Sequence, residues 1–246
     1  MNSLKKIDYI SDWIKEYATS LSFQPVSLVI GVSGGIDSAV TSALCAKTGF
    51  KTIAISMPIK QNLNQHDLSL KHLDWLKSNF DNVETRIIEL DKVFESFENT
   101  MQDFNNSLAF ANSRSRLRMV TLYQIAQANR GIVVGTGNKV EDFGVGFYTK
   151  YGDGGVDISP IADCTKSQVW ELGKYLGVLK EIVEAKPTDG LWNDGRNDED
   201  QLGMTYQELE MAMKNEKDPN YKKYLQIREK NLHKMNPIPV CKFNNE

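Results

Sequence analysis

A short apolar run that ends in a loop of glycine and serine is the feature that most constrains how this chain can fold. Residues 26–32, Val-Ser-Leu-Val-Ile-Gly-Val, are typical of a strand that is buried in a parallel sheet. The loop over 31–38 reads Gly-Val-Ser-Gly-Gly-Ile-Asp-Ser, and an apolar face at helical spacing follows over 38–47. A buried strand, a tight loop and a helix in this order predict the first unit of an α/β fold.

Further strands and helices alternate along the first 135 residues. In chain order the predicted elements are helix 3–20, strand 26–32, helix 38–47, strand 51–57, helix 68–80, strand 83–90, helix 107–129 and strand 131–135. This alternation predicts the fold class α/β, a Rossmann-like parallel sheet flanked by helices and joined by right-handed crossovers. Helical patterns return over 167–176, 205–214 and 219–234, which predicts a C-terminal helical extension. We expect residues 1–246 to form a single domain.

The composition argues against several classes of protein. With 29 Lys and Arg against 32 Asp and Glu, the net charge is −3, whereas nucleic-acid-binding domains are usually strongly basic. The three cysteines form no C-x-x-C pair, so neither a disulfide framework nor a thiolate zinc site is expected. The N-terminus lacks the apolar segment of a signal peptide, and every apolar stretch is shorter than the roughly 20 residues of a membrane-spanning helix. We therefore expect a cytoplasmic protein that binds neither nucleic acid nor membrane.

The loop over 31–38 has the composition of an anion-binding site. Glycines let the backbone approach a ligand, and the helix that follows directs its free N–H groups and positive dipole end to the same place. Ser33 and Ser38 add hydroxyl donors for phosphate oxygens. Asp37 would repel a bare phosphate, so its presence predicts a bridging divalent cation, for which Mg²⁺ is the expected ion. A capped glycine-rich turn without a ligand is the structural alternative.

The loop differs from two common nucleotide-binding motifs. It lacks the G-x-x-x-x-G-K-[ST] of P-loop hydrolases, and Ser33 interrupts the G-x-G-x-x-G of dinucleotide-binding folds. Instead, S-G-G-x-D-S over 33–38 resembles the pyrophosphate loop of the ATP pyrophosphatases, enzymes that split ATP into AMP and pyrophosphate. The resemblance implies that the loop binds ATP through Gly31, Val32, Ser33, Gly34, Gly35, Ile36, Asp37 and Ser38.

Later segments resemble one family within that group, the ammonia-dependent NAD⁺ synthetases. The matching segments are N-x-x-x-R-x-R-M over 112–119, G-T-x-x-x-x-E over 135–141, G-F-Y-T-K-Y-G-D-G-G-V-D over 146–157, K-P-T over 186–188, D-E-x-x-L-G-x-x-Y over 198–206 and His233-Lys234. The resemblance implies a two-step reaction. The nicotinate carboxylate of deamido-NAD⁺ attacks the α-phosphate of ATP and releases pyrophosphate, and ammonia then displaces AMP from the acyl-adenylate to give NAD⁺.

The same resemblance implies residues for ATP and its cation. Thr136 would contact the adenine end of ATP, while Lys166 and Thr188 would contact its phosphates. Asp37 and Glu141 would hold Mg²⁺ against the phosphate oxygens. The expected cofactor is therefore Mg²⁺, with ATP as a co-substrate.

Catalysis and binding of deamido-NAD⁺ are likewise assigned by resemblance. Lys166 is expected to be catalytic, and so is Asp153, which would hold ammonia beside the activated carbonyl and accept a proton. The positions that match deamido-NAD⁺-binding residues are Arg116, Lys150, Asp157, His233 and Lys234. Family members are homodimers, so a homodimer is also expected.

Four further expectations concern the remaining motifs. The acidic segment 188–201 is expected to be a lid that orders when substrates bind, with a solvated loop as the alternative. The loop begins at Gly31, which leaves no room before it for a glutamine-hydrolysing domain, so free ammonia is the expected nitrogen donor. His66 and His72 lack an H-E-x-x-H partner and are taken as structural, and Trp75 and Phe80 as core residues.

Two other functions stay open at the level of sequence. One is a different ATP pyrophosphatase, RNA-modifying or GMP-forming, against which the acidic charge and the lack of paired cysteines argue. The other is a nucleotide-binding regulator without turnover, which would be expected to have lost Asp37, Glu141 or the loop serines. All of these residues are present, which favours the synthetase.

Overall fold

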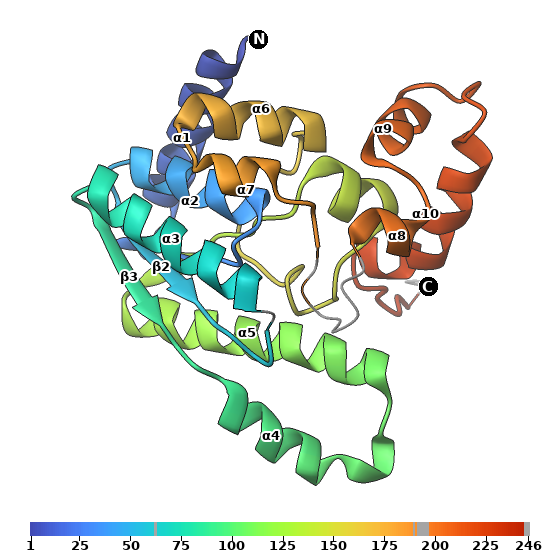
Figure 1. Ribbon diagram of the computed structural model, residues 1–246, viewed down its shortest axis with the longest axis horizontal. Coiled ribbons are helices and arrows are strands. Elements are labelled where there is room, and N and C mark those ends of the chain that lie inside the picture. Colours follow the sequence, from blue (N-terminus) through green and yellow to red (C-terminus); the bar gives the residue numbers. More distant parts are fainter. Residues whose placement is uncertain (62, 189, 191–196, 244–246) are drawn as a thin grey trace.

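The computed structural model describes residues 1–61, 63–188, 190 and 197–243. Its centre is a sheet of four parallel strands in the order β3-β2-β1-β4 (Figure 1). The strands are β1 (Ser27–Gly31), β2 (Lys51–Ser56), β3 (Val83–Ile87) and β4 (Gly131–Val133). Val29 of β1 is in register with Ile53 of β2 and Val133 of β4. The predicted α/β class with a parallel sheet is confirmed, although β3 and β4 end earlier than their apolar patterns suggest.

Alternate residues of the strands supply two separate cores. Leu28 and Ile30 of β1 face one core, whereas Val29 faces the other, as the period of two in a strand requires. The first core is covered by α1 (Ser3–Ser20), α2 (Ile36–Lys47), α3 (Leu63–Asn79), α6 (Lys166–Leu176) and α7 (Lys180–Glu184). The second is covered by α4 (Asp91–Thr100) and α5 (Ser107–Ala128). The sheet is therefore buried on both faces, which explains its nearly continuous apolar strands.

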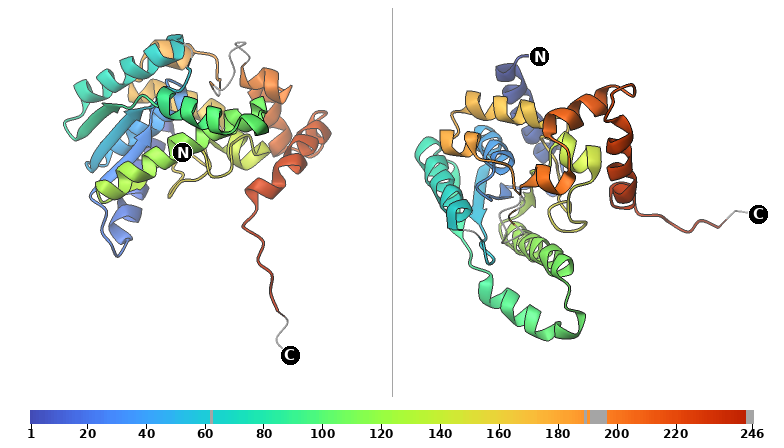
Figure 2. Two further views of the ribbon diagram at one scale, coloured as in Figure 1. Left: turned by 90° about the horizontal axis from the view of Figure 1, so that it is seen from below. Right: turned by 45° about the vertical axis from the view of Figure 1, so that its right-hand side comes forward.

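The C-terminal helices form a third cluster beside the sheet domain. Here α8 (Asp198–Leu202), α9 (Tyr206–Lys214) and α10 (Tyr221–Met235) pack on a π-helical turn over Lys139–Val145. Figure 2 shows these helices to one side of the sheet and the chain leaving the body after α10. The predicted C-terminal helical extension is confirmed. None of the described helices is both long and apolar enough to cross a membrane.

Three helices and one short turn escape the sequence patterns. α7 and α8 have five residues each, too few for an apolar period to appear, and the 3₁₀ turn over Gln102–Phe104 has three. α4 has ten residues, and of these only Phe94 is buried. Trp75 and Phe80 pack against the first core, as expected. His72 is fully buried behind α2 with its Nε2 2.9 Å from the Ser42 hydroxyl, which agrees with a structural role.

Candidate functional site

A cavity of about 520 Å³ opens at the carboxyl ends of β1 and β4. This edge of a parallel sheet is where ligands usually bind in α/β proteins. The structure brings to its walls every residue expected to bind ATP or Mg²⁺, together with Asp153 and Lys234. Those ATP and Mg²⁺ residues are the loop over 31–38, Thr136, Glu141, Lys166 and Thr188. Segments more than 150 residues apart in the sequence thus meet at one place.

Residues 31–38, here called the phosphate loop, are held in shape by glycine and serine. Gly34 has a φ of +89°, and a Cβ atom there would come within 2.5 Å of the Gln65 carbonyl oxygen of α3. The hydroxyls of Ser33 and Ser38 lie 3.1 Å apart, and Ser38 also donates to the Gly35 carbonyl at 3.0 Å. Gly35 is the N-cap residue of α2 and has no side chain that could accept a hydrogen bond from the helix. The first N–H groups of α2 therefore stay available to an anion.

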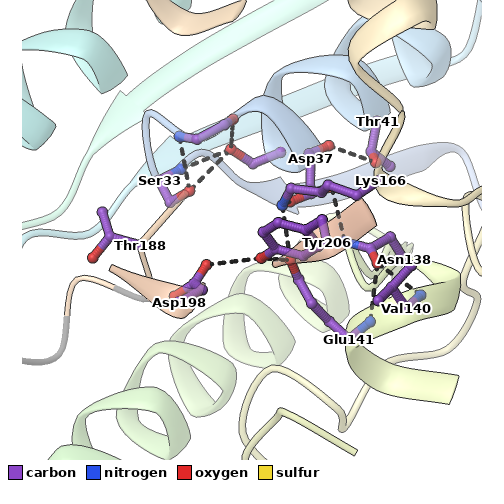
Figure 3. Close-up of polar contacts among 12 residues, drawn as sticks. Ser33, Asp37, Thr41, Asn138, Val140, Glu141, Lys166, Thr188, Asp198 and Tyr206 are labelled. Atoms are coloured by element: carbon purple, nitrogen blue, oxygen red, sulfur yellow. Dashed lines mark hydrogen bonds and ion pairs between the residues drawn. The ribbon is translucent and has the colours of Figure 1, made fainter. Parts of the chain in front are cut away.

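The loop shares Asp37 with a group of four polar side chains, here called the ion cluster: Asp37, Asn138, Glu141 and Lys166 (Figure 3). The Lys166 ammonium donates to Asp37 Oδ2 at 2.6 Å and to Glu141 Oε1 at 2.8 Å. The Asn138 amide donates to Asp37 Oδ1 at 3.2 Å and accepts from the backbone N–H of Val140 and of Glu141. The cluster therefore joins α2, the π-helical turn and the first residue of α6.

The charges in the ion cluster do not balance. Burial opposes the charge on Lys166, but the carboxylates of Asp37 and Glu141 outweigh it and raise the pKa of the ammonium. Burial also disfavours ionisation of Glu141, yet Lys166 and a hydrogen bond from Tyr206 lower its pKa. Burial raises the pKa of Asp37, partly offset by Lys166. With one ammonium for two carboxylates, the cluster in its ionised form carries an excess negative charge that attracts a cation.

The donor set fits Mg²⁺ that is shared with phosphate. Mg²⁺ is usually held by one or two carboxylates and by substrate phosphate oxygens rather than by a complete protein cage. In the described part of the chain no three Asp, Glu, His or Cys side chains are grouped so as to hold a metal ion by themselves. The carboxylate of Asp37 at the end of the anion-binding loop, together with that of Glu141, meets that description.

Asp153 is fixed by α5 on another wall of the cavity. Its Oδ1 accepts from the Ser115 hydroxyl at 2.7 Å and from the Thr149 N–H at 3.0 Å. Gly152 permits this approach, because a Cβ there would come within 2.3 Å of the Ser115 oxygen. The cavity walls partly desolvate the carboxylate, and this raises the pKa of Asp153 although both hydrogen bonds favour its charged form. Ser115 is a site residue that the sequence did not single out.

The residues matched to deamido-NAD⁺ fall into three places. Lys234 reaches the cavity, where its ammonium donates to the Gly146 and Tyr148 carbonyls at 2.6 and 2.8 Å. Arg116, Lys150 and His233 form a group beside it. In that group the Arg116 Nε donates to the Lys150 carbonyl at 3.2 Å, and the Lys150 ammonium lies 3.5 Å from the His233 carbonyl.

Asp157 lies away from the main cavity. It borders a second cavity of about 530 Å³, whose walls include Tyr17, Phe23 and Tyr123. Its carboxylate accepts from the Tyr123 hydroxyl at 2.9 Å and from the Val133 N–H at 2.7 Å. The structure thus separates Asp157 from the other predicted site residues.

The expected lid over 188–201 is only partly covered by the structure. Thr188 and Gly190 line the main cavity, and 198–202 form α8, of which Asp198 and Gln201 also reach the cavity. Residue 189 and residues 191–196 lie outside the described part of the chain.

Comparison with known proteins gives a consistent answer. The family model described as NAD synthase matches residues 6–242. An NH₃-dependent NAD⁺ synthetase from Mesoplasma florum is 37% identical, covering 93% of this chain and 91% of its own length. One from Finegoldia magna is 36% identical, covering 87% and 86%. A solved structure of NMN synthetase from Francisella tularensis is 33% identical with a TM-score of 0.89, and the match covers 99% of this chain and 100% of that one.

The resemblance noted in the motifs therefore extends over the whole fold and nearly the whole sequence. The family model matches residues 6–242, and both relatives are more than 30% identical over most of their length. This chain is a member of the NAD synthase family.

Proposed function

We propose that this protein amidates the nicotinate carboxylate of deamido-NAD⁺ with ammonia, consuming ATP and releasing AMP and pyrophosphate. The observation that carries the proposal is one cavity that combines an anion-binding loop, a negatively charged ion cluster and the oriented carboxylate of Asp153. The names of the two curated relatives support the same reaction. Both steps need charge neutralisation and positioning of reactants rather than a covalent enzyme intermediate.

For the first step, the phosphate loop and Lys166 would bind the phosphates of ATP. The N–H groups at the start of α2 face the site where the phosphates would lie. Asp37 and Glu141 would hold Mg²⁺, which when bound would neutralise phosphate oxygens and favour departure of pyrophosphate. The Lys166 ammonium, now shared between these two carboxylates, would then be available to the phosphates.

For the second step, Asp153 would take a proton from bound ammonium, and the ammonia so formed would attack the acyl-adenylate and release its own extra proton to solvent as the amide forms. Ser115 and Thr149 fix the Oδ1 atom of Asp153, so the other oxygen can point to the substrate. A raised pKa brings the carboxylate closer to a useful general base than an ordinary aspartate. The leaving AMP carries the oxygen of the former carboxylate away.

A second candidate is the same reaction on nicotinate mononucleotide. The observation in its favour is the solved structure of an NMN synthetase, whose fold matches this chain over 99% of its length. Both candidates use the same loop, cluster and Asp153, and they differ only in whether an adenylate half of the substrate must be accommodated.

The test is a comparison of the two substrates in one assay. The purified protein is incubated with ATP, Mg²⁺ and ammonium, and with either deamido-NAD⁺ or nicotinate mononucleotide, and the products are separated by chromatography. We expect NAD⁺ and AMP in equal amounts, at a higher kcat/KM than for the mononucleotide. A higher kcat/KM for the mononucleotide would establish the second candidate instead.

We also propose that the protein acts as a homodimer. Large apolar side chains are exposed on α4, on α5 and on the turn between them, among them Val93, Phe97, Phe104 and Val120. Exposed apolar side chains of this size, if they adjoin, are typical of an interaction surface, and here they come from neighbouring elements of the chain. Light scattering during gel filtration should give about twice the chain mass of 27.8 kDa, and a monomer at micromolar concentration would contradict the proposal.

A further inference from the structure

Tyr206 lies where the ion cluster meets the C-terminal helices, and it has no assigned role. It is the first residue of α9, and 2% of its surface is exposed. Its hydroxyl donates to Glu141 Oε1 and lies 3.2 Å from Asp198 Oδ2 of α8. Its ring packs edge-on against Trp170 at 5.8 Å between centroids, and the Lys166 ammonium lies 4.9 Å from the ring centre. Figure 3 shows the phenol between the two carboxylates.

The Tyr206 phenol is a hydrogen-bond donor that lies within reach of two carboxylates. A tyrosine has one O–H hydrogen and can donate it to one acceptor at a time. A phenol ordinarily ionises only at about pH 10, so at neutral pH the hydroxyl keeps its hydrogen. In this structure the hydrogen bond to Glu141 is the shorter of the two.

These hydrogen bonds determine which carboxylate oxygen of Glu141 can bind a cation. Its Oε1 accepts from both Tyr206 and Lys166, which fixes the plane of the carboxylate. Because both of these donors use Oε1, Oε2 is the oxygen that can turn to a ligand. The carboxylate is therefore oriented with one oxygen held by the protein, as expected for a metal ligand supported by an outer hydrogen bond.

The same tyrosine also ties α8 to the cluster. In addition to the contact with Asp198, the backbone N–H of Tyr206 donates to Glu199 Oε1 at 2.8 Å. Asp198 and Glu199 are the first two residues of α8. A change in the hydrogen bonding of Tyr206 therefore changes the contacts that hold the start of this helix. When a cation takes over part of the charge of Glu141, Glu141 becomes a weaker acceptor and Asp198 a relatively better one.

We propose that Tyr206 is a positioning residue that orients Glu141 for the divalent cation and couples occupancy of that site to α8. The proposal rests on the metal role of Glu141 in the proposed function. On cation binding the O–H hydrogen bond moves from Glu141 toward Asp198 and draws the start of α8 against the cavity.

The test is Tyr206→Phe in the full-length protein, which keeps the ring and its packing and removes only the hydroxyl. Mn²⁺ binding is measured by electron paramagnetic resonance in the presence of a non-hydrolysable ATP analogue. We expect about a tenfold loss of Mn²⁺ affinity, in line with the effect of removing an outer hydrogen-bond partner of a metal ligand. The KM for Mg²⁺ should rise by a similar factor, with the KM for deamido-NAD⁺ unchanged.

The matched control is Tyr224→Phe. Tyr224 is buried in the same C-terminal cluster as Tyr206 but packs beside Tyr221, with 6.1 Å between ring centroids. Among the described residues it is Tyr206 whose hydroxyl reaches Glu141 and Asp198, so removal of the Tyr224 hydroxyl should leave Mn²⁺ affinity unchanged. Hydrogen–deuterium exchange gives a second measurement. Mn²⁺ with the analogue should protect the amides of α8 in the wild type and in Tyr224→Phe, and protect them less in Tyr206→Phe.

The outcomes separate this proposal from the proposed function. If the wild type makes NAD⁺ and binds Mn²⁺ but Tyr206→Phe binds it equally well, the positioning role is wrong and the function stands. Equal losses in Tyr206→Phe and Tyr224→Phe would mean that packing alone matters, which also overturns the role. A wild type that makes no NAD⁺ and binds no Mn²⁺ beside the ATP analogue would overturn both.

Discussion

The phosphate loop and the ion cluster adjoin at Asp37 beside one cavity, but they are built in different ways. The loop is eight consecutive residues whose shape follows from a strand, a helix and a glycine at positive φ. The cluster gathers Asp37 from α2, Glu141 from the π-helical turn and Lys166 from α6, up to 129 positions apart. The loop therefore depends on local backbone geometry, and the cluster depends on the tertiary fold. Asp37 belongs to both, so it joins the two sides.

The largest effect is expected from breaking the cluster. Lys166→Met would leave two mostly buried carboxylates without their shared ammonium, and removal of one member of a buried ion pair costs about 3–5 kcal/mol of stability. Amide synthesis should fall by at least about 100-fold, because charge stabilisation of the phosphates is lost. Urea denaturation and steady-state kinetics measure the two effects.

The control for that variant is Lys139→Met. Lys139 pairs with Asp163 at 2.7 Å, but both side chains are exposed, and such pairs contribute little. Equal loss of stability in the two variants would contradict the claim that the ion cluster is a buried, tertiary feature.

Breaking the loop should produce the next largest effect. Gly34→Ala would force a side chain into positive φ and against the backbone of α3, so we expect a loss of about 2–4 kcal/mol in the free energy of unfolding. ATP binding, measured by calorimetry, should weaken at least about tenfold because the loop must move.

Gly49 provides a matched comparison within the same chain. Its φ is +81°, but a Cβ atom at this position would meet no other atom within 4 Å. Gly49→Ala should therefore cost only the backbone strain, about 1–2 kcal/mol, and leave ATP affinity unchanged. If Gly34→Ala behaved like Gly49→Ala in both measurements, close packing on α3 would not define the loop.

These two regions also show how much could be predicted from the sequence. The strand, loop and helix around residue 34 are local, so periodicity and glycine chemistry predict them, with the helix beginning two residues earlier than expected. The fold class follows from the same local patterns repeated along the chain. Helices α7 and α8 were not predictable in this way, since five residues carry no usable period.

The cluster could be reached from sequence only through family resemblance. No spacing rule connects Asp37, Glu141 and Lys166, because their meeting depends on how three elements pack. Resemblance supplied these three but not Ser115 or Tyr206, whose hydroxyls contact Asp153 and Glu141. Tyr206 did stand in a matched motif, D-E-x-x-L-G-x-x-Y, and that was the one signal for it. Asp157 was matched as well, yet the structure places it at the second cavity.

Asp153 lines the same cavity but belongs neither to the phosphate loop nor to the ion cluster, and its substitution tests the second step of the reaction. Asp153→Asn should lower kcat with ammonium by about 100-fold, because the general base is lost. Release of pyrophosphate in a single turnover should persist, since the first step uses the loop and the cluster. Ser115→Ala, which removes the hydroxyl's hydrogen bonds to the carboxylate and to the backbone N–H of Asp153, should reduce kcat by about fivefold. Unchanged kcat and KM for ammonium in Asp153→Asn would remove Asp153 from the reaction.

The smallest effect near neutral pH is expected from His72 behind α2, because its contribution to stability changes only in acid. Burial lowers the pKa of His72 from 6.5 to about 4. Between these pH values the unfolded chain takes up a proton that the folded chain does not, so stability falls as the pH drops from about 6.5 to about 4. The loss contributed by this group is at most about 3 kcal/mol. Urea denaturation of His72→Gln should show a shallower pH dependence than the wild type, and an identical dependence would contradict this origin.

In the proposed reaction the loop and the ion cluster together activate a carboxylate for attack by ammonia. The most direct measurement supplies ¹⁵N-labelled ammonium with ATP, Mg²⁺ and deamido-NAD⁺, and follows the products by mass spectrometry. We expect one ¹⁵N atom in the carboxamide of each NAD⁺ and one AMP for each NAD⁺ formed. Pyrophosphate release without labelled NAD⁺ would contradict the proposed reaction.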